Sequence, residues 1–121
     1  MGVHVPLHCT ASGKLFLASM SRERRARVLG QLTLKSLTPN TLTDAAALRA
    51  DCDRISQQGY SVDNEEFIPG LVAVAVPVRD RGGEVRAAMA VHAPVARMSL
   101  AQMLEHLPAL NDAALRMTEL L

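Results

Sequence analysis

The fold is decided by residues 71–94, LVAVAVPVRDRGGEVRAAMAVHAP, in which two β-prone runs flank a polar turn. The paired glycines of the turn RDRGGE are typical of a hairpin connection, so this stretch predicts two antiparallel strands. Side chains alternate between the faces of a sheet. One face of the first strand is therefore bulky and the other mostly small: Val72, Val74, Val76 and Val78 lie on the first, and Leu71, Ala73, Ala75 and Pro77 on the second.

The second strand divides into two faces in the same way. Val85, Ala87, Met89 and Val91 share one face, and Arg86, Ala88, Ala90 and His92 share the other. If the small faces of the two strands coincide, the sheet has a hollow with an alanine floor and His92 at its end. The alternation equally allows a second interpretation, in which the alanines let a helix pack closely on the sheet.

Helices are predicted before and after the hairpin, from capping residues and from apolar residues that recur at spacings of three and four. Glycines at 59 and 70 are expected to take conformations that end a helix and turn a loop into a strand. In chain order we expect a helix over 12–19; a helix from the cap Ser21 to Leu29, stopped by Gly30; a helix capped by Thr41 or Thr43 and ended by a left-handed Gly59; a strand over 60–63; and a helical region capped by Ser99 and kinked or divided at Pro108.

The composition predicts one domain with an aliphatic core. The 121 residues are 49% hydrophobic, with one Tyr, two Phe and no Trp, so no set of aromatic rings is available to stack bases. The net charge is +1, and the only dense basic run, SRERRARVLG at 21–30, is interrupted by Glu23. A nucleic-acid surface within this segment is therefore disfavoured.

The cysteine, histidine and hydropathy patterns argue against metal sites and membrane spans. Cys9 and Cys52 have no metal-ligand or CxxC spacing, which favours a reduced, cytoplasmic protein. The histidines at 4, 8, 92 and 106 include no HxxxH pair, so no metal and no cofactor is expected. No apolar run approaches the roughly 20 residues that a membrane span requires, and we see no signal peptide.

The start of the first helix, in HCTASGKLFLASM at 8–20, is the most specific chemical feature. It is not a P-loop, because His8 stands where that motif needs glycine and Leu15 follows Lys14. The first amides of a helix have no partner within it, and the helix dipole is positive there. Thr10, Ala11, Ser12 and Gly13 could therefore hold a carboxylate through backbone N–H groups. A plain N-cap by Thr10 or Ser12 is the simpler alternative.

Two further groups were weighed as chemical residues. Asp63 ends a predicted strand, where side chains often reach a site, whereas Glu65 and Glu66 are more typical of turn caps or solvent-facing residues. His8 and Cys9 are adjacent on an extended segment, so their side chains point apart, and we expect a structural role for Cys9.

Three segments together resemble the C-terminal effector-binding domain of the IclR family of bacterial transcription regulators: PLHCTASGKLFLA, LTPNTLTD and ISQQGYSVDNEEFIPGLVAVAVPVRDRGGEVRAAMAVHAP. The resemblance implies an α+β fold in which a curved, largely antiparallel sheet is flanked by helices, related to GAF-type sensors of small molecules. It also implies that the domain binds a small organic or aromatic acid, and that a separate N-terminal helix-turn-helix domain binds DNA.

The resemblance implies a pocket between the sheet and the helix start. It would be lined by Ala11 and Ser12, by Asp63, by Ala73 on the first long strand, and by Ala90 and His92 on the second. Several members of the family have Cys or Ser at the last three positions. The alanines and the histidine of this chain therefore imply a different pattern of hydrogen bonds to the ligand.

We accordingly expect residues 1–121 to form an effector-binding domain that is truncated at its N-terminus, and that is neither an enzyme nor a DNA-binding unit. The missing first strands would leave an unpaired sheet edge, which favours a homo-oligomer, either a dimer or a tetramer. Two alternatives stay open at this point: a small enzyme acting on a carboxylate metabolite through His8, Cys9 or Asp63, and a purely structural dimerisation module.

Overall fold

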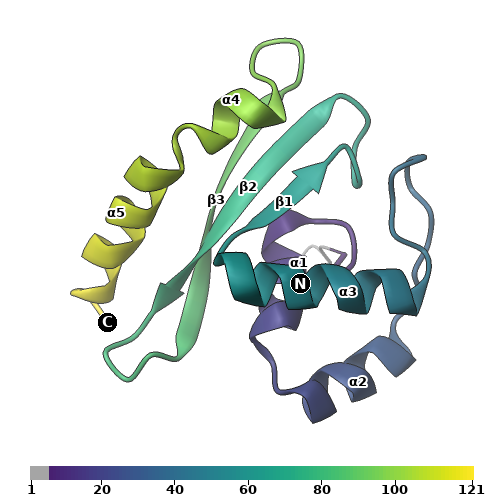
Figure 1. The fold of residues 1–121 in the computed structure, drawn as a ribbon, viewed down its shortest axis with the longest axis horizontal. Coiled ribbons are helices and arrows are strands. Elements are labelled where there is room, and N and C mark those ends of the chain that lie inside the picture. Colours follow the sequence, from purple (N-terminus) through teal and green to yellow (C-terminus); the bar gives the residue numbers. More distant parts are fainter. Residues whose placement is uncertain (1–5) are drawn as a thin grey trace, which may run out of the picture.

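The computed structural model describes residues 6–121 as helices on both sides of a small sheet (Figure 1). The described elements, in chain order, are α1 (Ala11–Ser19), α2 (Arg22–Gln31), α3 (Ala45–Gln58), β1 (Ser61–Asn64), β2 (Leu71–Arg79), β3 (Val85–Pro94), α4 (Leu100–Leu104) and α5 (Leu107–Thr118). The predicted α+β class and the predicted hairpin are confirmed.

The sheet is antiparallel, with its strands in the order β1, β2, β3. Ala73 lies opposite Asp63 on one side and His92 on the other, and the next row joins Ser61, Ala75 and Ala90. Residues directly opposite each other in a sheet point to the same face. The small faces of β2 and β3 therefore coincide, as the first of the two sequence interpretations required.

Each face of the sheet is covered by different helices. The valines of β2 pack under α4 and α5, where Val72 and Val74 contact Met103, and Val76 and Val78 contact Ala114. Helix α1 covers the small face (Figure 1). The helix of the C-terminal region is divided as predicted, because Pro108 stands in the first turn of α5 and needs no hydrogen bond there.

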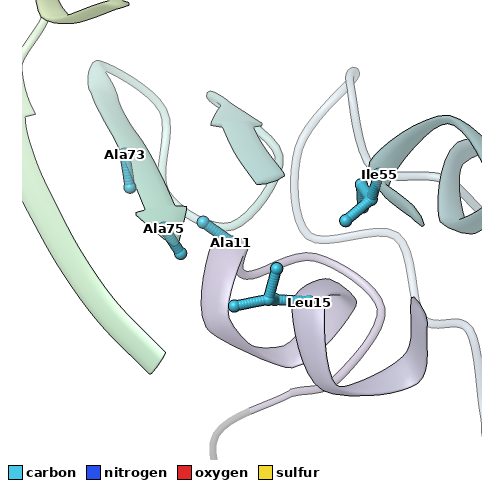
Figure 2. Close-up of a cluster of buried hydrophobic side chains, with 5 residues drawn as sticks. All are labelled: Ala11, Leu15, Ile55, Ala73 and Ala75. Atoms are coloured by element: carbon cyan, nitrogen blue, oxygen red, sulfur yellow. The ribbon is translucent and has the colours of Figure 1, made fainter. Parts of the chain in front are cut away.

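The alanines of the small face allow α1 to pack closely, which was the second sequence interpretation. Ala11 and Leu15 of α1 form a buried cluster with Ile55, Ala73 and Ala75 (Figure 2). Ala18, Ala88 and Ala90 pack against this cluster. Most of the alanine floor is therefore under the helix, and the row of Asp63, Ala73 and His92 lies toward the N-terminal end of α1.

Two predicted helix ends are wrong. Helix α2 runs through Gly30 to Gln31, because Leu32 takes an extended conformation and its N–H bonds the carbonyl of Val28. Helix α3 is capped by Asp44 and not by Thr41 or Thr43. The hydroxyl of Thr41 is engaged elsewhere, since it donates to the carbonyl oxygen of Glu66 at 2.6 Å and accepts from the Thr38 amide at 3.0 Å.

Gly59 ends α3 in the left-handed conformation that was predicted, with φ of 84°, and Gly70 has φ of 81°. We expect Gly59→Val to lower the free energy of unfolding by at least about 1 kcal/mol, because a β-branched residue is strained at positive φ. Gly59→Asn is the matched control, since asparagine tolerates this region and should cost less. Urea unfolding followed by circular dichroism measures both variants. Equal stability of wild type and Gly59→Val would contradict the argument.

Candidate ligand-binding site

The first turn of α1 has one engaged amide and two free ones. Thr10 is the N-cap: its Oγ1 accepts from the Gly13 amide at 3.0 Å and donates to the carbonyl of Pro6 at 2.8 Å. The Gly13 amide is thus already engaged, which narrows the predicted set of ligand donors. The amides of Ala11 and Ser12 have no acceptor among residues 6–121, so these two N–H groups are the donors that the helix start offers.

Asp63, Ala73 and His92 form a row across the three strands on the face toward α1. Asp63 is 2% exposed, and its Oδ1 accepts from the Glu66 amide at 2.7 Å. Burial raises the pKa of the Asp63 carboxyl, and the neighbouring charge of Glu66 adds to the rise. His92 lies on the outer strand and is exposed. The row therefore combines a buried acceptor, a small central residue and an accessible imidazole.

Lys14 fixes the start of α1 in place. Its side chain is 1% exposed, and its Nζ donates to Asp51 Oδ2 and to Glu66 Oε1, each at 2.8 Å. Burial alone lowers the pKa of Lys14, but the charges and hydrogen bonds of Glu66 and Asp51 outweigh it and raise the pKa. This ion cluster joins α1 to α3 and to the loop after β1. Sequence analysis missed it, although a lysine within the apolar run of a helix was a signal that it needed buried partners.

His8 and Cys9 have structural surroundings. The ring of His8 is buried, and its Nε2 lies 2.8 Å from the carbonyl oxygen of Lys35. Cys9 is fully buried, and burial, together with the charges of Asp63 and Glu66, raises the pKa of its thiol to about 11. The thiol is therefore protonated at neutral pH and does not serve as a nucleophile.

The predicted site is open along the end of α1, and the larger hollows of the described chain lie elsewhere. A groove of about 430 Å³ lies on the other side of the sheet, between β2, β3 and the helices α4 and α5, and another of about 460 Å³ lies between α2 and α3. Within residues 6–121 no three His, Cys, Asp or Glu side chains gather where they could hold a metal ion, and His4 lies outside the described residues. No helix of the described chain is long and apolar enough to cross a membrane.

Solved structures of bacterial transcription regulators share this fold. The double mutant of the PobR transcription factor inducer-binding domain from Acinetobacter, in complex with 3-hydroxybenzoic acid, matches with a TM-score of 0.94 and 30% identity, and covers 100% of this chain and 70% of that one. The C-terminal domain of the Escherichia coli transcriptional regulator KdgR matches with a TM-score of 0.85 and 38% identity, over 94% of this chain and 70% of that one. The fold and the helix start thus define a regulator domain.

The chain belongs to the family of bacterial transcriptional regulator IclR C-terminal domains, whose model matches residues 1–119. A curated relative from Cupriavidus necator, "Probable transcriptional regulator SauR", is 42% identical over 113 residues, which are 93% of this chain and 45% of that protein. The chain thus spans about half the length of this relative. The family is one of regulatory domains and not of enzymes, in agreement with the prediction from sequence.

Proposed function

We propose that this domain senses a small organic acid and thereby controls DNA binding by another part of a full-length regulator, acting in the cytoplasm. The observation that carries the proposal is the pair of free amides of Ala11 and Ser12, beside the row of Asp63, Ala73 and His92. Two relatives support it: the PobR domain is described with 3-hydroxybenzoic acid, and KdgR is described as an HTH-type regulator.

The proposed ligand places its carboxylate on the Ala11 and Ser12 amides, where the helix dipole favours negative charge. Ala73 and Ala90 leave room for the rest of the molecule. Asp63 faces a hydroxyl or a bound water, because an ionised carboxylate only accepts hydrogen bonds and repels the acid group. His92 donates to a second oxygen. These contacts favour a compact aliphatic or single-ringed acid over a nucleotide.

Calorimetry with short oxo-acids, hydroxy-acids and benzoates tests the proposal. We expect Ser12→Pro to weaken binding of the preferred acid about tenfold or more, because it removes one charge-assisted hydrogen bond. Glu23→Pro is the matched control, since Glu23 occupies the equivalent second position of α2, away from the site. It should leave the affinity unchanged.

Two outcomes would contradict the proposal. The first is tight binding that survives Ser12→Pro unchanged, and the second is a preference for uncharged amides over the acids. Absence of binding across the whole panel would instead favour the structural dimerisation module.

Self-association is a second expected property. Strand β3 has no strand partner on its outer side among residues 6–121, and Val91 on it is 43% exposed. An unpaired strand edge invites another strand. We expect sedimentation at roughly 50 μM, a concentration suited to weak association, to show dimers, and Val91→Lys to reduce their fraction. A wild-type monomer at that concentration would overturn the prediction.

A further inference from the structure

Ser61 carries a buried hydroxyl that the fold leaves unpaired. It is the first residue of β1 and is 0% exposed. Among the described residues, its Oγ is the enclosed side-chain polar atom for which no hydrogen-bond partner exists. Buried polar atoms in native proteins almost always have a partner, and leaving one without a partner lowers stability. An atom of this kind points to a partner that is absent from the free chain.

The surroundings of Ser61 explain why its hydroxyl stays unpaired. Ser61 lies opposite Ala75, which lies opposite Ala90, and all three are on the face toward α1. Ala75 itself packs against Ala11, Leu15 and Ile55, whose side chains contain only carbon (Figure 2). A buried water needs two to four polar partners, so this apolar lining does not favour a water as the permanent partner.

Ser61 is next to the proposed acid site. It lies two residues before Asp63 on the same strand and the same face, which places the two Cα atoms roughly 7 Å apart. The row of Asp63, Ala73 and His92 therefore adjoins the row that contains Ser61. A compact acid held at the start of α1 spans such a distance with its carboxylate at one end and a polar substituent at the other.

We propose that Ser61 determines specificity by forming a hydrogen bond to a hydroxyl or oxo oxygen of the bound acid. This inference rests on the proposed function and adds a substrate class to it: acids with a second oxygen function, in preference to the same acids without one. Because α1 covers the hydroxyl in the free domain, a ligand that reaches Ser61 must move α1 away from β1.

Matched pairs of acids test the inference by calorimetry: 3-hydroxybenzoate against benzoate, and 2-oxobutyrate against butyrate. In the wild type we expect the oxygenated member of at least one pair to bind about tenfold more tightly. Ser61→Ala should abolish that preference, while the affinity for the plain acid stays within about twofold. Ser61→Thr keeps the hydroxyl and should retain the preference.

Thermal unfolding of the acid-free variants separates recognition from a structural role. Ser61→Ala should unfold at the same temperature as the wild type or higher, because it removes an unpaired buried group. Ser56→Ala is the control: its hydroxyl bonds the carbonyl of Ala18 at 3.0 Å, and its loss should leave the preference between acids unchanged.

Acid binding with the same preference in wild type and Ser61→Ala would overturn this inference and leave the proposed function standing. A lower unfolding temperature of acid-free Ser61→Ala would overturn it as well, by showing that the hydroxyl has a partner in the free domain. Failure of every acid to bind would overturn both proposals.

Discussion

Replacing Gly13 by alanine should destabilise the domain by about 3 kcal/mol, through overpacking and loss of the helix cap. A Cβ at this position would lie 2.6 Å from the Cα of Leu7 and from Thr10 Oγ1, and 2.7 Å from the carbonyl oxygen of Leu7. Two of these contacts are with backbone atoms, so rotation of a side chain does not relieve them. The segment before α1 has to move, and the Thr10 cap is lost with it.

Urea unfolding followed by far-ultraviolet circular dichroism measures this effect. Gly30→Ala is the matched control, because Gly30 lies within α2 and a Cβ there meets no atom within 4 Å. It should raise stability by about 0.5–1 kcal/mol, since alanine is the better helix former. A stability of Gly13→Ala equal to that of the wild type would show that the segment before α1 is not packed against Gly13.

Lys14→Met should have an effect of similar or greater size, a loss of about 3–5 kcal/mol. The substitution leaves Glu66, which is 7% exposed, without its buried counter-ion, and an unpaired buried charge is costly. The effect should be constant across neutral pH. The folded pKa of Lys14 is raised, so its contribution is complete below the ordinary value of 10.5 and is lost only as pH rises through the higher folded value.

Arg116→Met provides the comparison for Lys14→Met. Arg116 also forms an ion pair, with Asp112 at 2.9 Å, but its side chain is 79% exposed. Exposed pairs of this kind contribute little, so this variant should unfold at nearly the wild-type urea concentration. Equal effects of the two substitutions would contradict the structural role assigned to Lys14.

The hairpin and its two faces could be predicted from sequence because strand alternation and turn glycines are local signals. Ala73 and Ala90 were placed on one face before any register was known. Their main role was not predictable, since alternation does not reveal whether a helix or a ligand covers the alanines. The structure places Ala11 and Leu15 over Ala75, which gives most of the floor to packing.

The features that sequence analysis missed depend on contacts between distant segments. Lys14 pairs with Glu66, 52 residues away, and nothing near either residue identifies its partner. Thr41 is a good capping residue by type, but its hydroxyl bonds the carbonyl of Glu66 and leaves the cap of α3 to Asp44. Ser61 was passed over because a serine in a short strand is ordinary until its burial without a partner is known.

The central claim is that the amides at the start of α1 receive a small carboxylate. Its most direct test is a titration of the ¹⁵N-labelled protein with 3-hydroxybenzoate, followed by backbone amide NMR, with 3-hydroxybenzamide as the uncharged control. We predict that the largest shifts occur at the amides of Ala11 and Ser12, and that the benzamide does not produce them. Largest shifts in the groove between β2, β3, α4 and α5, or equal responses to the acid and the amide, would contradict the account.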